Sequence, residues 1–201
     1  MVAAVEKSDR IVEVGFQRRQ SVALKQATDL VKSGTLGDLV QVALLTGTDF
    51  GTQHGQFIST EAYRELFQPF HRRLNRLIHG RSAWKTFIHS CGAVRGLIPD
   101  FIESGFDILN PVQCSATGME PENLKRDFGK DIVFWGGGVN TQKTIAFGTP
   151  EETYREVRER IDIFNPGGGF VFNSIHNIQA DTPTENMLAM FKAIRDSGGG
   201  A

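Results

Sequence analysis

A histidine and a cysteine stand two positions apart at the end of a short apolar run that spans residues 85–92. In an extended segment, side chains at positions i and i+2 leave the backbone on the same face, so His89 and Cys91 can point into one space. Imidazole and thiolate are ligand types that zinc prefers. Because an open zinc site typically takes three protein ligands, the pair predicts a metal site only if another segment supplies a third.

Strand-like and helix-like segments alternate along the chain and would position this pair. We expect strands at 10–16, from about 38 to 45, and at 85–88, 106–109, 132–135 and 170–173. Helices are expected between them, at 2–7, 21–32, after Ser59 or Thr60, at 94–104, and after Pro121, Thr149 and Thr182. Pro69 should kink the helix after Ser59 or split it in two.

Two helix starts carry the same capping signal. Thr149 is followed by Pro150 and, three residues after Thr149, by Glu152, which is the pattern of a capping box with proline at the first helical position. Thr182 and Glu185 repeat the device before the final helix. We therefore expect threonine side chains to cap both helices. The final helix runs through Leu188, Phe191 and Ile194.

Alternating strands and helices predict an α/β fold with a parallel sheet. The loops that follow the strands carry Asp, Asn, Gln, His, Cys and Gly, whereas the turns before the strands look structural. This asymmetry is typical of a TIM-type (β/α) barrel, whose active site lies at the carboxyl ends of its strands. A complete barrel needs roughly 250 residues, so about six strands in 201 residues predict an incomplete (β/α)8 barrel.

Composition excludes several classes of partner. The chain has 22 basic and 23 acidic residues and a formal net charge of -1, so it offers no electrostatic case for nucleic acid or an anionic membrane. It has no apolar run long enough to span a membrane and no secretory signal pattern, and we expect a soluble, cytoplasmic protein. Cys91 and Cys114 are expected to be free thiols in a reducing compartment.

The histidines on the long helix predict no site. His71 and His79 lie on this helix or at its end, close in sequence to four arginines. Such a cluster is most simply a solvated basic face. The arginines are Arg72, Arg73, Arg76 and Arg81.

Five polar side chains follow predicted strands and could contact a ligand. Asp49 and Gln53 are candidates for catalysis, either by touching substrate or by orienting a histidine. The competing interpretation is that Asp49 satisfies local backbone donors. Asn110, Gln113 and Gln179 are neutral amides suited to binding a polar substrate, although such amides often only tie loops together.

Seven segments occur in an order that identifies a family: 48–53 (TDFGTQ), 89–92 (HSCG), 107–113 (DILNPVQ), 124–129 (LKRDFG), 134–138 (FWGGG), 148–152 (GTPEE) and 182–186 (TPTEN). On these segments, residues 44–196 resemble the carboxyl-terminal part of the uroporphyrinogen decarboxylase superfamily. That superfamily also contains the zinc-dependent methylcobamide:thiol methyltransferases. The resemblance implies a TIM-type barrel and an enzyme that acts on a small-molecule substrate.

The resemblance also implies a ligand set. In the methyltransferase branch, a later cysteine in the loop before the final helix completes the His-x-Cys pair, and here that loop holds His176. Since histidine also ligates zinc, the implied site is His89, Cys91 and His176, where a bound thiol becomes a thiolate for methyl transfer. A corrinoid protein would be the partner. In the competing interpretation no metal binds, Cys91 is a small buried residue, and both histidines contact an organic substrate.

Residues 1–43 carry two other segments, 10–19 (RIVEVGFQRR) and 33–38 (SGTLGD), and resemble an interior piece of a glucose-fructose-type NAD-dependent oxidoreductase. The Gly-x-Gly-x-x-Gly fingerprint and its acidic ribose partner are missing, so we expect no NAD binding. The two resemblances predict an oxidoreductase-like βα fragment at 1–43 packed onto a barrel fragment at 44–201. The amino-terminal half of the barrel would then be absent, and in decarboxylases that half holds the arginine-rich substrate segment and the essential aspartate.

Three functions are compatible with these features. The leading hypothesis is zinc-dependent methyl transfer from a methylated corrinoid to a thiol. The first alternative is uroporphyrinogen decarboxylase in porphyrin biosynthesis, which uses no metal and needs basic residues for substrate carboxylates, as Arg95, Lys125 and Arg126 would provide. The second alternative is a catalytically silent truncated or chimeric protein, with an open sheet edge covered in a homodimer.

Overall fold

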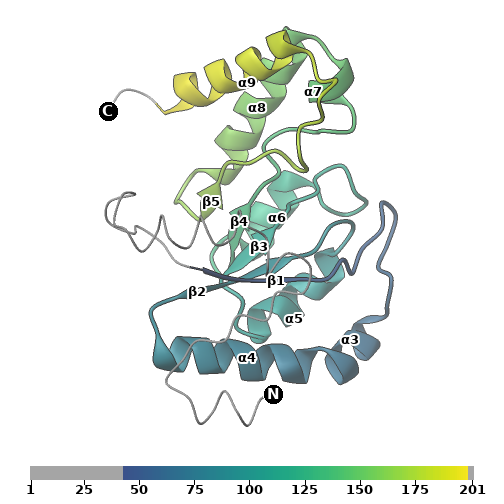
Figure 1. The fold of residues 1–201 in the computed structure, drawn as a ribbon, viewed down its shortest axis with the longest axis vertical. Coiled ribbons are helices and arrows are strands. Elements are labelled where there is room, and N and C mark those ends of the chain that lie inside the picture. The colour runs from purple at the N-terminus through teal and green to yellow at the C-terminus, as the bar shows by residue number, and fades with distance from the viewer. Residues whose placement is uncertain (1–42, 199–201) are drawn as a thin grey trace, which may run out of the picture. The chain divides into compact units, whose positions relative to one another are not determined.

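The computed structural model describes residues 43–198, which contain a five-stranded sheet (Figure 1). All neighbouring strands are parallel, and their spatial order follows the chain. The strands are β1 (Ala43–Gly47), β2 (Lys85–His89), β3 (Ile108–Asn110), β4 (Val133–Trp135) and β5 (Phe170–Val171). This order is that of a (β/α) barrel, so the predicted incomplete TIM-type barrel is confirmed.

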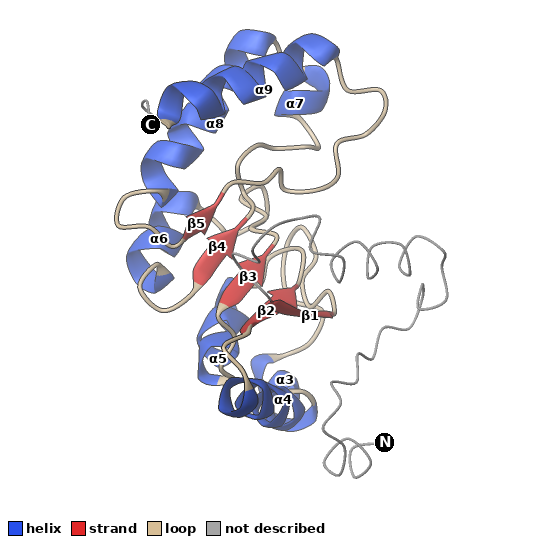
Figure 2. Ribbon diagram, turned by 60° about the vertical axis from the view of Figure 1, so that its left-hand side comes forward, coloured by secondary structure: helices blue, strands red, loops and turns tan. Residues whose placement is uncertain are grey.

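Helical segments occupy each connection between strands, as a parallel sheet requires (Figure 2). They are α3 (Thr60–Leu66), α4 (Gln68–Arg81), the 3-10 turn η1 (Arg95–Leu97), α5 (Ile98–Glu103), α6 (Pro121–Phe128), α7 (Thr144–Phe147) and α8 (Pro150–Phe164). α9 (Thr184–Ser197) follows β5. No described helix is long and apolar enough to cross a membrane. Several expected elements lie outside the described residues, namely the strand at 10–16 and the helices at 2–7 and 21–32. The fragment predicted at 1–43 also lies outside them, except for residue 43, which is the first of β1.

The parallel register aligns the strand ends where chemistry is expected. Gly47 of β1 is paired with His89 of β2, and His89 is paired with Asn110 of β3. These three residues are the last of their strands. The loops after β1, β2 and β3 therefore begin side by side at the carboxyl edge of the sheet.

One face of the sheet carries the main hydrophobic core. Ile88, Leu109 and Phe134 come from three neighbouring strands and pack with helix residues such as Phe101 and Leu124. All five side chains are almost completely buried. Burial of such side chains contributes about 1.5 to 3 kcal/mol each, so this core holds the strand ends in register.

The other face of the sheet carries the residues that alternate with this core. Phe87 and Trp135 are half-buried there, with their rings in edge-to-face contact at 5.5 Å between centroids. His89 lies two positions after Phe87 in β2, so it leaves the strand on the same face. The sheet face that carries Phe87 and Trp135 therefore also carries His89, at the carboxyl end of β2.

Two predicted helix starts are confirmed. Ser59 caps α3, where its side chain accepts from the N–H of Ala62, and α4 begins after Phe67 with Pro69 in its first turn. At α8, the N–H of Glu152 donates to Thr149 Oγ1, and the Glu152 carboxylate accepts from the N–H of Thr149. The predicted split at Pro69 and the capping box at Thr149 are therefore both present.

The second predicted capping box is wrong. α9 begins at Thr184, its cap position is Pro183, and no side chain caps it. The N–H of Thr182 instead donates to the carbonyl of Gln179, and Thr182 is buried in that turn. Thr182 therefore belongs to this turn, and the helix starts two residues later.

The buried face of α9 combines a polar contact with apolar packing. Asn186 Nδ2 donates to the carbonyls of Ile145 and Gly148, which lie at α7. Asn186 shares the buried face of α9 with Met190 and Ala193, which pack in a hydrophobic cluster with residues of α8. The predicted helix passes through Leu188 and Phe191 as expected, but both of these side chains are exposed.

The prediction of a solvated face is wrong for His71. Its Nδ1 lies 2.8 Å from the Tyr63 hydroxyl, and its ring contacts Phe106 edge to face at 5.1 Å. Burial lowers the pKa of His71 from 6.5 to about 4. His79, at the end of α4, pairs with Asp107 at 2.8 Å.

Helical spacing explains the position of His71. Gln68 and Asn75 are the buried residues of α4, and His71 lies between them at spacings of three and four. Gln68 donates to the Asp100 carboxylate, and Asn75 donates to the carbonyl of Ser104. The inner side of α4 is therefore polar and hydrogen-bonded, which composition alone does not reveal.

We predict that His71 makes stability depend on pH. The folded protein binds this proton more weakly than the unfolded chain, so the contribution of neutral His71 is complete above about pH 6.5 and is lost as pH falls to about 4. The expected loss is about 1 to 2 kcal/mol, after allowance for the partial exposure of the ring. Urea unfolding of wild type and His71→Gln at pH 7.5 and 4.5 measures it. The exposed His54 gives the control His54→Gln, and equal pH dependence in all three proteins would contradict the prediction.

Candidate metal centre

Three side chains converge where β1 and β2 end. The ligand atoms of Asp49, His89 and Cys91 all lie within 4.8 Å of one another. His89 Nε2 is 3.6 Å from Cys91 Sγ and 4.0 Å from Asp49 Oδ1. The structure thus brings together the predicted histidine and cysteine, and it adds Asp49, which the sequence marked for catalysis.

Strand register explains why Asp49 reaches this position. Asp49 follows Gly47 by two residues, Cys91 follows His89 by two residues, and Gly47 and His89 are paired. The N–H of Cys91 donates to Asp49 Oδ1 at 2.9 Å, which holds the carboxylate against the neighbouring loop. The polar loop was expected after Leu45, whereas β1 continues to Gly47, so this alignment was not visible in the sequence.

The two loops meet through glycine. A side chain at Gly51 would lie 2.7 Å from the nitrogen of Ala93 and 2.8 Å from the carbonyl oxygen of Cys91. A side chain at Gly92 would overlap the backbone of Gly51, and Gly92 also has a φ of 90°. Only glycine permits both the backbone conformation and this close approach. A backbone hydrogen bond from the N–H of Ala93 to the carbonyl of Thr52 also joins the two loops.

Amide side chains extend this network to the loop after β3. The N–H of Gly92 donates to Gln113 Oε1 at 2.8 Å, and Gln113 Nε2 donates to Gln53 Oε1 at 2.9 Å. Gln53 Nε2 in turn donates to the carbonyl of Ser115. Gln53 and Gln113 therefore tie three loops together, and their catalytic and substrate-binding roles stay predictions. Asn110 at the end of β3 hydrogen-bonds with His89.

The electrostatics of the cluster favour a cation. Burial and the nearby Asp49 carboxylate raise the pKa of the Cys91 thiol to about 11. A thiolate and a carboxylate at this separation repel each other unless a positive charge lies between them. Nitrogen, sulfur and carboxylate oxygen are all zinc ligands, so the three residues fit this metal. His89 and Asp49 side chains remain 41% and 52% exposed, which leaves an open side for another ligand.

His176 and Gln179 do not join this cluster. Both are exposed in the segment between β5 and α9. Ser174 Oγ donates to the carbonyl of His176, and Gln179 Nε2 donates to the carbonyl of Asn177. The group found among the described residues contains neither, so the ligand role of His176 and the substrate role of Gln179 stay predictions.

The basic residues considered for carboxylate binding are engaged elsewhere. Arg95 and Arg126 both pair with Asp127, and Arg95 also lies over the Phe128 ring. Lys125 Nζ donates to the carbonyl of Gly168 at 2.7 Å. Each of these three basic groups therefore has an acidic or carbonyl partner away from Asp49, His89 and Cys91, and Asp127 alone serves both arginines.

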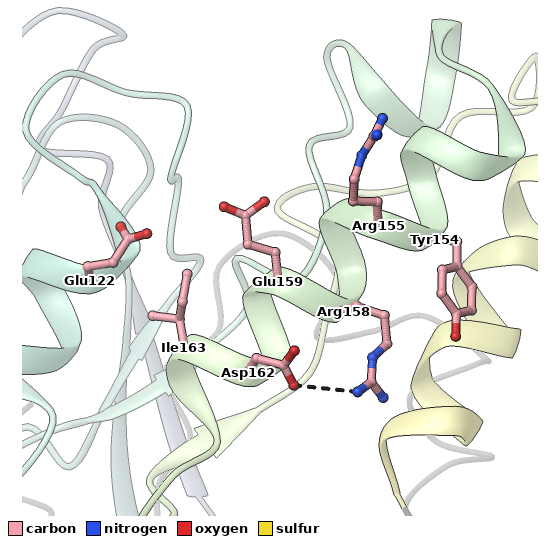
Figure 3. A pocket seen from close by; sticks show the side chains of 7 residues that line it. All are labelled: Glu122, Tyr154, Arg155, Arg158, Glu159, Asp162 and Ile163. Carbon is pink, nitrogen blue, oxygen red and sulfur yellow. Dashed lines mark ion pairs between the residues drawn. The ribbon is translucent and has the colours of Figure 1, made fainter.

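A surface pocket of about 590 Å³ lies along α8 (Figure 3). Its lining does not include Asp49, His89 or Cys91. Arg158 in this pocket pairs with Asp162 at 3.6 Å and donates to Ser197. Acidic and basic side chains alternate there, so no single charge sign is presented to a ligand. The lining residues are Glu122, Tyr154, Arg155, Arg158, Glu159, Asp162 and Ile163.

Known proteins share these sequence features. The family model of uroporphyrinogen decarboxylase (URO-D) matches residues 37–197. A methylated-thiol--coenzyme M methyltransferase of Methanosarcina mazei is 29% identical over 141 residues, which are 70% of this chain and 34% of that protein. A uroporphyrinogen decarboxylase of Magnetococcus marinus is 24% identical over 112 residues, which are 56% of this chain and 29% of that protein. The chain thus spans about a third of the length of these curated relatives.

A solved structure supports the fold. A methyltransferase from Methanosarcina mazei superposes with a TM-score of 0.59 at 18% sequence identity. The match covers 87% of this chain and 48% of that structure. At this sequence identity, the superposition shows only that the two chains share an α/β barrel architecture.

We predict that Gly92→Ala separates the two loops of the cluster. The added methyl group overlaps the Gly51 backbone and the residue needs a positive φ, so the free energy of unfolding should fall by about 2 to 4 kcal/mol. Gly55→Ala is the matched control, because a side chain at Gly55 meets nothing within 4 Å. Urea unfolding of both variants measures the difference. Equal stabilities would show that the loops do not need this contact.

Proposed function

Because this chain belongs to the uroporphyrinogen decarboxylase (URO-D) family, we propose that it uses zinc, held by Asp49, His89 and Cys91, to present a thiol for methyl transfer from a methylated corrinoid. The proposal rests on one observation, the convergence of three zinc-type ligand atoms within 4.8 Å. When bound, zinc lowers the pKa of a coordinated thiol, so the sulfur is a thiolate at neutral pH. The chain's own residues hold the cation and leave one side of it open.

Each side chain of the cluster has a separate task in this proposal. Cys91 and Asp49 supply two negative charges, which balance a divalent cation once the Cys91 proton has left. His89 supplies a neutral nitrogen from the end of β2. His176 remains a candidate for the open position, because it follows β5 and parallel strands end at the same edge of the sheet. A thiol substrate would compete for that position.

The neighbouring sheet face suits the proposed methyl donor. Phe87 and Trp135 are half-buried and lie on the face of the sheet from which His89 projects. A corrin ring is broad and largely apolar, and aromatic side chains make favourable contacts with such a body. A substrate with several carboxylates would instead need free basic groups, and Arg95, Lys125 and Arg126 are already partnered. These three basic groups therefore add no support for uroporphyrinogen decarboxylation, although in decarboxylases the arginine-rich substrate segment belongs to the amino-terminal half of the barrel.

We predict that the purified chain binds about one zinc per molecule through these ligands. Cys91→Ala and His89→Ala should lower zinc affinity by more than about 100-fold, since each removes a direct ligand. Asp49→Asn should weaken binding by a smaller factor, because the amide still accepts from the N–H of Cys91 but lacks the charge. Competition with a chromophoric chelator and metal analysis of dialysed protein measure these effects.

Matched variants separate the possible third ligands. Asp131→Asn removes an exposed carboxylate outside the cluster and should leave zinc affinity unchanged. His176→Ala should also have little effect if Asp49 is the third ligand. Loss of zinc in His176→Ala but not in Asp49→Asn would assign the third position to His176. Equal zinc content in wild type and Cys91→Ala would rule out the site.

We predict zinc-dependent demethylation of methylcobalamin by a thiol such as coenzyme M. The zinc-loaded chain should demethylate methylcobalamin faster than free zinc with thiol does. The rate of the Cys91→Ala variant should fall to that background, because the variant lacks a metal ligand. The cobalamin absorbance change and the methylated thiol both report the reaction. If the chain binds zinc but its reaction rate stays at the background level, the methyl-transfer proposal is wrong and the metal site still stands. Decarboxylation of uroporphyrinogen without zinc would support the alternative function.

A further inference from the structure

Asn110 links the candidate ligand His89 to the backbone of a third strand. Its Oδ1 lies 2.7 Å from His89 Nδ1, and its Nδ2 donates to the carbonyl of Trp135 at 2.8 Å. The three residues are the last of β2, β3 and β4. The Asn110 backbone takes part as well, since its carbonyl accepts from the N–H of Ser90 at 2.7 Å. The side chain is thus held between two neighbours at the strand ends.

The Trp135 carbonyl decides which way the amide of Asn110 points. A carbonyl oxygen only accepts, so the NH₂ group of Asn110 must face it. The amide oxygen then faces His89, and a hydrogen bond there requires the proton to be on Nδ1. The reverse orientation would place two oxygens against each other. A backbone group of β4 therefore determines where the His89 proton resides.

We infer that Asn110 is a positioning residue that holds neutral His89 in its Nδ1–H tautomer. Nε2 then carries a free lone pair and faces Cys91 Sγ at 3.6 Å and Asp49 Oδ1 at 4.0 Å. In the other tautomer, a proton would occupy the side of the ring that faces both groups. The consequence for zinc rests on the proposed function, whereas the tautomer itself does not. This role differs from the substrate contact that the sequence predicted for Asn110.

The tautomer can be measured without metal. Long-range ¹H–¹⁵N spectra of metal-free protein with ¹⁵N-labelled histidine, recorded at about pH 9 where ordinary imidazole is neutral, distinguish a protonated from a free ring nitrogen. His89→Gln assigns the His89 signals. In wild type we expect the proton on Nδ1, and in Asn110→Ala we expect a shift toward Nε2–H. A wild-type proton on Nε2, or an unchanged tautomer in Asn110→Ala, would overturn the inference.

Two further variants separate tautomer control from general structural effects. Asn110→Asp loses the donor to the Trp135 carbonyl but keeps an oxygen acceptor for Nδ1–H, so the folded variant should retain the wild-type tautomer. Asn123→Ala removes an asparagine of α6 that bonds only to exposed groups, so its His89 signals should match wild type. Thermal unfolding identifies a variant that fails to fold, and Asn110→Asp then carries the test alone. A move to Nε2–H in Asn110→Asp would overturn the inference.

Zinc affinity gives a second readout. Asn110→Ala should bind zinc about 10- to 100-fold more weakly than wild type, and Asn110→Asp should restore most of this loss. A tautomer change with unaltered zinc affinity would overturn the positioning role for the metal. If wild type itself binds no zinc, the proposed function fails, but the NMR result for the tautomer still stands or falls separately.

Discussion

The packing of two glycines, Gly51 and Gly92, is the constraint on which the candidate site depends. Their backbones approach so closely that neither position admits a Cβ atom. The approach brings the loop after β1 against the loop after β2, and it lets the N–H of Cys91 reach Asp49. Without it, the third donor atom would have no fixed position relative to His89. The cluster is therefore a product of backbone packing as much as of ligand chemistry.

Neutral amides stabilise this arrangement without adding charge. Gln113 and Gln53 connect the loops after β1, β2 and β3, and Asn110 connects β2 to β4. Each hydrogen bond contributes only about 0.5 to 1.5 kcal/mol, but together they remove freedom from the loops that carry ligand atoms. Because amides do not titrate, they hold His89 and Cys91 without changing the charge balance of the cluster. Charge then comes from Asp49 and Cys91 alone, which suits a divalent cation.

The same strand ends distinguish two kinds of family chemistry. A metal needs a few donor atoms at short range, and one edge of a parallel sheet can supply them from adjacent strands. Recognition of several carboxylates needs free cationic groups spread over a wider surface. In the described part of the chain, Arg95 and Arg126 are paired with Asp127. The donor atoms of Asp49, His89 and Cys91, by contrast, lie close to one another. The three donor atoms are thus compatible with a bound metal, and the chain spans about a third of the curated relatives' length.

The sequence by itself determined the features that depend on local periodicity. The spacing of two residues placed His89 beside Cys91, the Thr149 and Glu152 pattern defined a helix start, and Pro69 divided a helix, because each involves residues a few positions apart. Tertiary structure alone brought Asp49 to His89 and Cys91, through a register between strands 42 residues apart and through a glycine contact. It also decided which face of α4 is buried, and therefore that His71 is half-buried. Those outcomes depend on which neighbour a segment packs against, and no spacing within the segment encodes that partner.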